Sequence, residues 1–424
     1  MLSPEGLVAL AAVLTVLGLL ALHFWEGWLE VSGALAEEEE EEKGIPFMAE
    51  GGSGCRLLCK PSALAQHLVW SLGRSAALQG GRWPWPRWPQ LQMLRQLLQP
   101  PEPELVVARE LLQLPDAGLV ALDWLVGPWE AVGGGEGGVS SAVLLLIPNA
   151  AGKVTGGLLQ LGLRALERGF IPVIFNRRGH NGCPLTTPQL QPFGDPGDLR
   201  EALSYLRCRH PGASLLAVSE GSGSGLLLAY LGESGSSSRL AAAACLSPIF
   251  RARDWFEAGM PWLYEWPLLL HLKQGLSRYA GALAEAVDMD RLLGSRSLRE
   301  LEECLFCRTR SRPTSWELYW ERNEPLRDAD EAAVPVLCLC SADDPVRGAP
   351  ARTVPTQLFR SSPYFFLLLA RRGGHCGWGH EAVLDYFRAM AEFLRADERR
   401  KGPRRWGGPA AEPPAFTWHR SYTR

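Results

Sequence analysis

The chain has 424 residues, a formal net charge of −3, and 46% hydrophobic against 21% charged residues. This composition excludes a disordered chain, and the near-neutral charge argues against a protein whose main ligand is the phosphate backbone of a nucleic acid. The length allows one large α/β domain with extensions, or two domains. The 10 Cys are scattered through the chain and do not predict a disulfide framework.

The first feature along the chain is an apolar run from Gly6 to Leu22, which is followed by Phe24, Trp25 and Trp28. The run is short for a membrane span and long for the core of a signal peptide, whereas the aromatic flank is typical of a membrane interface. We therefore expect residues 1–25 to be an uncleaved single-pass anchor in an endomembrane. The alternative is a signal peptide, after whose cleavage the protein would be secreted.

Residues 26–100 are expected to form an acidic linker and then an arm rich in Trp and Pro. The six consecutive glutamates at 37–42 repel one another and cannot pack, which favours a solvated linker. The sequence WPWPRWP at 83–89 cannot be a regular helix or a central strand. This arm either packs on a domain or provides a docking surface for a membrane or a partner.

From residue 101 to 395, strand patterns alternate with helical patterns, which predicts a parallel sheet covered by helices on both faces. The expected strands are 142–147, 171–175, 215–218, 241–246, 334–339 and 364–369, and the expected helices are 158–168, 199–207 and 225–231. Residues 251–330 interrupt the alternation with helical segments that contain five Trp, which indicates an inserted cap. The tail at 396–424 is rich in Arg, Pro and Gly, so we expect it to be disordered.

Cys304 and Cys307 form a C-x-x-C pair, a spacing that also occurs in zinc sites. Zinc would need a second pair of ligands, and only Cys55 and Cys59 could supply it. Buried or free thiols are the simpler interpretation, and the sequence predicts neither a metal nor a cofactor.

The residues that carry chemistry follow the predicted strands. In a parallel α/β sheet, function concentrates at the carboxyl ends of the strands. A turn that starts at Ser219 follows one such strand, Asp343 follows another, and His375 follows the last. A serine hydroxyl is a weak nucleophile until a histidine accepts its proton, and a carboxylate orients that histidine and stabilises its charged form. The order serine, aspartate, histidine predicts a serine hydrolase.

On these and other motifs, the sequence resembles the α/β-hydrolases, and within them the membrane-anchored lipid esterases of the AB hydrolase 4 type. The resemblance implies a mostly parallel eight-stranded sheet with a helical cap, an N-terminal anchor and hydrolysis of acyl esters of lipids. It also implies that Asp343, rather than Asp344, is the acid of the triad and that His375 is the base. The motifs that carry it are Asp116-Ala117-Gly118 with Leu122-Asp123-Trp124, residues 173–179 (VIFNRRG), Leu185-Thr186-Thr187-Pro188, Tyr230-Leu231-Gly232, residues 341–345 (SADDP) and residues 373–378 (GGHCGW).

The turn that should contain the nucleophile departs from the family pattern Gly-x-Ser-x-Gly. Gap-free alignment from either side places the family serine at Gly221 and the first family glycine at Ser219. A gapped alternative makes Ser219 the nucleophile, at the cost of an insertion or deletion of two residues on each side of the turn. The serines of this turn also suggest a phosphate-binding loop, but no Gly-Lys-Ser/Thr is present, which disfavours nucleotide binding.

The oxyanion side of the site also departs from the family. Pro148-Asn149 replaces the Pro-Gly of the family, although the backbone N–H near Ala150 is still placed to donate to an oxyanion. If Ser219 were the nucleophile, Glu220 would follow it, and a carboxylate there would oppose a developing negative charge unless it pointed away.

Two functions follow from these departures. The first is a regulatory or scaffolding protein of lipid metabolism on a membrane of the secretory pathway, with little or no hydrolase activity. The alternative is an active serine hydrolase of the carboxylic-ester class that uses Ser219, Asp343 and His375. Both hypotheses predict a lipid or acyl-ester ligand, a membrane and no nucleic acid, and the first adds a regulatory protein partner.

Overall fold

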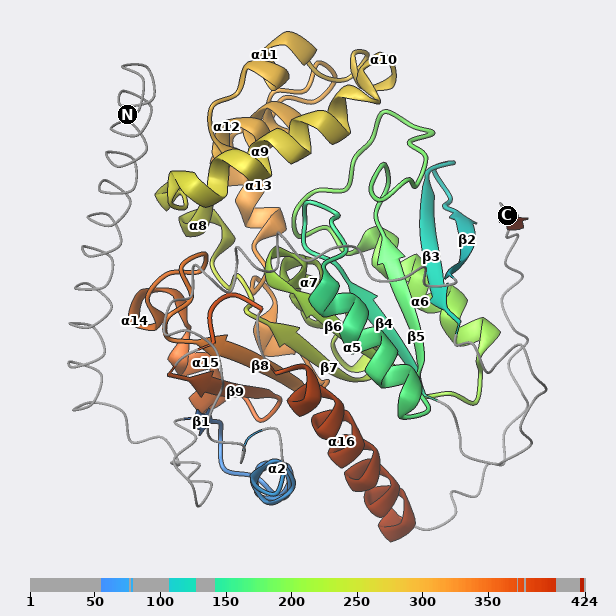
Figure 1. Ribbon diagram of the computed structural model, residues 1–424, viewed down its shortest axis with the longest axis vertical. Helices are drawn as coiled ribbons and strands as arrows, with labels where there is room; N and C mark the ends of the chain where they lie inside the picture. The colour runs from blue at the N-terminus through green and yellow to red at the C-terminus, as the bar shows by residue number, and fades with distance from the viewer. Residues whose placement is uncertain are drawn as a thin grey trace, which may run out of the picture.

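The computed structural model describes residues 55–75, 78, 107–126, 142–371, 373–376, 379–401 and 420–422 (Figure 1). The expected anchor, the glutamate run and the Trp/Pro segment at 83–89 lie outside these residues. Within the described ranges, no helix is both long enough and apolar enough to cross a membrane.

The described part of the chain is built on a single sheet in which β4 to β9 run parallel. Antiparallel strands extend this parallel centre at both edges. The strands lie in the order β1-β9-β8-β7-β6-β4-β5-β3-β2-β10. Their bounds are β1 (Cys55–Leu58), β2 (Val107–Gln113), β3 (Leu119–Leu125), β4 (Val143–Ile147), β5 (Ile171–Asn176), β6 (Leu215–Glu220), β7 (Leu240–Leu246), β8 (Val336–Ser341), β9 (Phe365–Ala370) and β10 (Arg420–Tyr422).

The expected fold class is confirmed, but the sheet has ten strands among the described residues, where the family resemblance implies eight and the residue pattern predicts six. The strands that the pattern does not predict are β1, β2, β3 and β10, which lie at the two edges of the sheet. The sequence predicts only a linker and an arm over residues 26–100, yet this range contains β1 and the helix α2 (Ala63–Gly73). The last long helix extends to Lys401, beyond the expected end of the domain.

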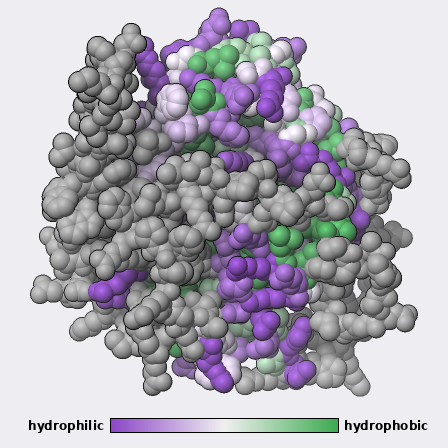
Figure 2. Space-filling model, viewed as in Figure 1, coloured by the Kyte–Doolittle hydropathy of each residue, from purple (hydrophilic) through white to green (hydrophobic). Residues whose placement is uncertain are grey.

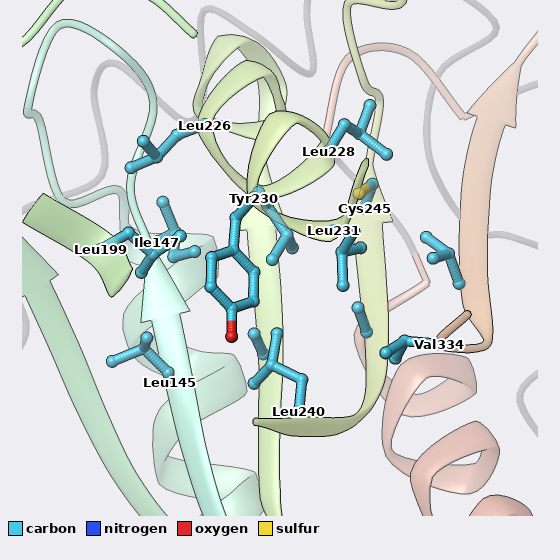
Figure 3. Packing of buried hydrophobic residues seen from close by; sticks show 14 of the residues in the cluster. Leu145, Ile147, Leu199, Leu226, Leu228, Tyr230, Leu231, Leu240, Cys245 and Val334 are labelled. Atoms are coloured by element: carbon cyan, nitrogen blue, oxygen red, sulfur yellow. The ribbon is translucent and has the colours of Figure 1, made fainter. Parts of the chain in front are cut away.

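Helices cover both faces of the sheet, because alternate residues of each buried strand point to opposite faces. One face packs against α2, α5 (Gly156–Glu167) and α16 (His380–Lys401). The other face packs against α6 (Gly197–Arg209), α7 (Ser224–Ser234) and α15 (Thr356–Ser361). In Figure 3, Tyr230 of α7 points down between Leu145 of β4 and Leu240 of β7. This packing fixes α7, and with it the turn that connects β6 to α7.

A helical cap is inserted between β7 and β8. Its core is an aromatic cluster in which Phe193 of the body contacts Phe256 and Trp320 of the cap. Two of its tryptophans, Trp262 and Trp266, are 61% and 63% exposed. Hydrophobic and hydrophilic residues are interspersed on the cap surface at the top of Figure 2. The cap helices are α8 (Ala252–Ala258), α9 (Trp262–Ser277), α10 (Ala280–Leu283), α11 (Met289–Gly294), α12 (Leu298–Glu302) and α13 (Trp316–Asn323), with a π-helical turn at Glu303–Cys307.

Candidate active site

The turns that follow β4, β6, β8 and β9 meet at one edge of the sheet, because these strands are parallel and neighbouring or nearly so. These turns bring together His375, the two aspartates that follow β8, and the start of α7. The site therefore lies where parallel α/β sheets place their chemistry.

His375 pairs with Asp344, and not with Asp343 as the sequence predicts. The Nδ1 atom of His375 lies 2.9 Å from Oδ2 and 3.1 Å from Oδ1 of Asp344. The Asp344 carboxylate is fully buried and also accepts the N–H groups of Val346 and Arg347. Burial by itself would raise the pKa of Asp344, but the facing His375 and the other donors lower it to about 2. Burial likewise opposes the charge of His375, yet Asp344 raises the pKa of this imidazole well above its ordinary value.

Asp343 has a different role in the same turn. Its Oδ1 accepts the backbone N–H groups of Gly373 and Gly374, both at 2.9 Å. It thereby fixes the loop that presents His375, while the next residue along the chain contacts the imidazole. Consecutive aspartates in a turn point in different directions, and the sequence pattern alone did not show which of them faces the histidine.

Gly221 occupies the position from which a side chain would reach His375. It follows β6 directly and has a φ of +53°, the left-handed conformation of a sharp strand-to-helix turn. A Cβ atom built on Gly221 would lie 2.9 Å from Nε2 of His375, the nitrogen that does not face Asp344. Gly223 is two residues further on, and a Cβ there would lie 2.1 Å from the carbonyl oxygen of Pro148. The turn thus keeps the close packing against Pro148 that Gly223 permits. At residue 221 it has no side chain to face the His375 ring.

Ser219 lies inside the sheet. It is the fifth residue of β6, pairs with Ile147 on one side and Cys245 on the other, and is completely buried. Its hydroxyl oxygen has no hydrogen-bond partner among the described residues, so it forms no hydrogen bond with His375. Of the three residues of the expected triad, His375 and Asp343 belong to loops that are joined by hydrogen bonds. The Ser219 hydroxyl forms no hydrogen bond to either of them.

Two backbone N–H groups of the loop after β4 already donate to side chains, one in the β6–α7 turn and one in the loop itself. The backbone N–H of Ala150, the expected oxyanion donor, donates to Oγ of Ser222 at 3.0 Å. The side chain of Asn149 accepts the N–H of Ala151 at 3.1 Å, which fixes the turn that glycine forms in the family. The Ser222 hydroxyl therefore accepts the N–H group that would otherwise donate to an oxyanion.

Glu220 and Cys376 lie near His375 and complete the polar surroundings. The Glu220 carboxylate is buried and accepts the hydroxyl of Thr155 at 2.8 Å. Burial raises the pKa of Glu220 to about 7, although Thr155 and His375 act in the opposite direction. The Cys376 thiol donates to the carbonyl of Leu246 at 3.5 Å, and its sulfur lies 3.9 Å from the Cβ position of Gly221. Burial raises the pKa of this thiol, which favours its neutral form.

The cysteines considered for zinc lie apart in the fold. Cys304 and Cys307 belong to the apolar cluster of the cap, whereas Cys55 and Cys59 pack under the sheet with α2 and α16. Within the ranges that the structure describes, no group of three or more His, Cys, Asp or Glu side chains is arranged to hold a metal ion.

Several contacts of the site were not anticipated from the sequence. Thr155 and Ser222 contact the site through single hydroxyl groups, and no motif marks them. Cys376 directly follows His375, but the burial of its thiol becomes apparent only in the fold.

The sheet order, the cap between β7 and β8, and the Asp344–His375 pair opposite the β6–α7 turn define an α/β-hydrolase fold. No protein-family model matches the chain. The chain is 52% identical to the human Protein ABHD15 over 465 aligned residues, which cover 99% of each protein. It therefore belongs to the α/β-hydrolase family, in the α/β-hydrolase domain-containing protein 15 branch that the sequence motifs indicate.

Two more distant similarities accompany this relative. The chain is 29% identical to the mouse Phospholipase ABHD3 over 240 residues, which cover 55% of this chain and 58% of that one. Among solved structures, the Pyrococcus furiosus esterase Pf2001 aligns with a TM-score of 0.42 and 13% sequence identity, and it covers 74% of this chain and 95% of its own.

Proposed function

We propose that this protein is an α/β-hydrolase-fold protein of lipid metabolism that has lost its serine nucleophile and acts as a regulatory or scaffolding protein. The observation that carries the proposal is the position of Gly221. Its left-handed backbone and the 2.9 Å from its Cβ position to His375 Nε2 support the proposal that residue 221 is the position of the family nucleophile. Removal of the nucleophile from a serine hydrolase typically lowers kcat by about 10⁶-fold.

The oxyanion side supports the same proposal. A tetrahedral intermediate needs backbone donors that are free to receive its negative oxygen. Here the Ala150 N–H is taken by the Ser222 hydroxyl, and the buried Glu220 carboxyl adds negative charge near the site when it is ionised. Both features disfavour an oxyanion next to residue 221.

The alternative is an active ester hydrolase that uses Ser219. Its hydroxyl is completely buried and has no hydrogen-bond partner in the described structure, whereas a working nucleophile lies within hydrogen-bond reach of its base. Activation of Ser219 by His375 would require β6 to change its register against β4 and β7. This requirement makes Ser219 the weaker candidate.

The proposed ligand class is a lipid or an acyl ester, and the proposed surroundings are a membrane and a regulatory protein partner. Support for the lipid comes from the family and from a relative named as a phospholipase. Support for the membrane comes from the apolar run at 6–22 with its aromatic flank.

A fluorophosphonate probe tests the loss of the nucleophile, because it labels activated serines covalently. The full chain and its Ser219→Ala variant are incubated with the probe beside an active serine hydrolase, and labelled peptides are identified by mass spectrometry. We expect neither form of this protein to be labelled. Strong labelling of the wild type that disappears in Ser219→Ala would show that the alternative is correct.

Cell fractionation tests the membrane assignment. We propose that residues 1–25 are an uncleaved anchor in an endomembrane. Deletion of these residues should move the protein from the membrane pellet to the supernatant. Unchanged pelleting of the deletion variant would refute a single N-terminal anchor, and recovery of the full-length gene product in the medium would instead indicate a cleaved signal.

A further inference from the structure

Arg177 is a buried arginine outside the Asp344–His375 site. It follows β5 directly and is only 5% exposed, yet its Nε and Nη2 atoms have no hydrogen-bond partner among the described residues. The next residue, Arg178, has partners for its guanidinium. It donates to both carboxylate oxygens of Asp198 at 2.6 and 2.7 Å and also pairs with Asp116. Burial of a charge is costly unless partners compensate for it, so Arg177 needs an explanation of its own.

Arg177 lines a small hollow beside the loop that follows β4. In this arrangement the hollow is too narrow to admit a water molecule. A ligand therefore enters only if the surrounding side chains or the cap move. The lining residues are Ile147, Pro148, Asn149, Gly152, Phe175, Asn176 and Arg177.

His180 provides a second unpartnered nitrogen next to the same hollow. Its buried Nδ1 atom has no hydrogen-bond partner among the described residues, and it would lie 2.8 Å from a Cβ atom built on Gly152, which lines the hollow. Burial lowers the pKa of His180 to about 3, so the ring is neutral and can donate a hydrogen bond from one nitrogen. The loop at residues 177–180 thus contains the Arg177 cation and the neutral His180 ring, and both have nitrogens without a hydrogen-bond partner in the described structure.

The cap contributes acidic groups to the surroundings of Arg177 but does not neutralise it. The acidic groups that face it are Glu302, Asp198, Asp195 and the Tyr319 hydroxyl, and none of them forms an ion pair or a hydrogen bond with it in the described structure. Asp198 is already occupied by Arg178. Glu302 accepts the Tyr319 hydroxyl, and burial raises its pKa to about 7, so it is only partly ionised near neutral pH.

Apolar side chains of the cap also lie close to the hollow. Ala150 packs against the apolar cluster of the cap, which contains Phe193 and Trp320. Tyr319, whose hydroxyl is near Arg177, stacks on Phe306 and Trp316 in the same cluster. A molecule with a negative end and a hydrocarbon chain would therefore match both sides of this junction between body and cap.

We propose that Arg177 and His180 form an anion subsite that binds the carboxylate or phosphate group of a single-chain amphiphile, whose hydrocarbon chain contacts the apolar cluster of the cap. The guanidinium offers two parallel N–H donors, a geometry suited to either oxyanion. This inference goes beyond the proposed function and does not depend on it, because an anion binds here whether or not the protein hydrolyses esters.

Equilibrium binding to the full chain tests the subsite. The protein is reconstituted in nanodiscs of uncharged phosphatidylcholine, and saturable binding of dodecanoate, dodecyl phosphate and the neutral dodecanol is measured. Arg177→Gln should weaken binding of the two anions by about 10- to 100-fold, as expected for loss of a hydrogen bond to a charged group, and should leave dodecanol unchanged. Arg239→Gln is the matched control, since Arg239 is exposed just before β7 at the opposite edge of the sheet.

Thermal unfolding of the variants separates binding from a structural role. Because Arg177 has no partner, Arg177→Gln should keep or raise the melting temperature, whereas a guanidinium held only for structure would lower it. Should Arg177→Gln fail to fold, His180→Phe replaces it, with an expected loss of anion affinity and unchanged dodecanol binding. Equal anion binding by a folded variant and the wild type overturns the proposal, as does the absence of saturable anion binding.

Inorganic phosphate distinguishes the source of the anion. If it competes with dodecyl phosphate at similar concentrations, the subsite recognises a free anion, and if only the amphiphiles bind, it recognises a lipid headgroup. Either result, when it depends on Arg177, supports the subsite.

Discussion

The turns after β8 and β9 and the turns after β4 and β6 face one another at the same edge of the sheet, but their contacts differ in kind. The first pair of turns contains an acid–base unit, in which Asp344 is buried, satisfied by two backbone N–H groups and directed at His375. The second pair has a glycine, without a side chain, at residue 221, and the Ala150 N–H donates to the Ser222 hydroxyl. The acid–base region has the contacts of a hydrolase, whereas in the nucleophile region the Ser222 hydroxyl accepts the Ala150 N–H and no side chain at residue 221 bonds to His375.

This difference indicates that the two regions are held in place by different forces. The Asp344–His375 pair and the Asp343 hydrogen bonds connect the loops after β8 and β9, so their loss would disturb the fold even in a protein without catalysis. The nucleophile has no such structural function, since a glycine there satisfies the turn. The aspartate and the histidine therefore have a structural role that does not depend on catalysis.

The largest expected effect is that of Asp344→Asn, which removes the charge opposite His375. Removal of one partner from a buried ion pair costs about 3–5 kcal/mol of unfolding free energy. The pKa of His375, which Asp344 raises, should fall to or below its ordinary value. Urea unfolding at pH 6 and NMR titration of the His375 ring measure both effects.

Asp343→Asn is the matched control for this substitution. Asparagine keeps an oxygen that accepts the N–H groups of Gly373 and Gly374, so we expect a loss of only about 1 kcal/mol and little change at His375. If Asp343→Asn lowers the pKa of His375 as much as Asp344→Asn does, the assignment of the partner is wrong.

Much of the fold was predictable from the sequence because buried strands and amphipathic helices alternate clearly. All six expected strands are present, for example β4 at Val143–Ile147 against the expected 142–147. The edge strands β1 and β10 were missed because they have four and three residues and form only by pairing with β9 and β2. Tertiary pairing, and not local periodicity, determines such short strands.

The site was predictable in part for similar reasons. Motif order located the Asp343-Asp344 turn and His375, and gap-free alignment located Gly221, whose φ of +53° then fits the turn. The sequence could not distinguish Asp343 from Asp344, because the choice depends on the direction of two adjacent side chains. It also gave no signal for Arg177, since the absence of a partner is a property of the packed structure.

A pH-dependent effect is expected at Glu220. Burial raises the pKa of Glu220 from its ordinary value of 4.5 to about 7, so the folded state binds the proton more tightly. The stability linked to this group is therefore complete below about pH 4.5 and is lost as the pH rises through about 7. Glu220→Gln should unfold at the same urea concentration as the wild type at pH 4.5 and be about 3 kcal/mol more stable above pH 7. A difference that does not vary with pH would contradict the burial of an ionisable Glu220.

The smallest effect is expected for Ser222→Ala, which frees the Ala150 N–H. Loss of one neutral hydrogen bond on a partly exposed turn should lower the unfolding free energy by about 1 kcal/mol or less. In a Gly221→Ser background the same change should increase ester hydrolysis, because the freed Ala150 N–H can then donate a hydrogen bond to an oxyanion. Urea unfolding and initial rates measure the two consequences, and an unchanged rate in that background would argue against Ala150 as the oxyanion donor.

The most direct test of the central claim is the rate of p-nitrophenyl butyrate hydrolysis by the wild type and by Gly221→Ser, with His375→Ala added to each. A serine Cβ at residue 221 would lie 2.9 Å from Nε2, so the ring must shift by a few tenths of an ångström to accept it. We predict that the wild type is no faster than its His375→Ala variant, and that Gly221→Ser exceeds both by about 10³-fold and loses this gain with His375→Ala. A wild type that hydrolyses the ester well above its His375→Ala variant, and falls to that level in Ser219→Ala, would contradict the loss of the nucleophile.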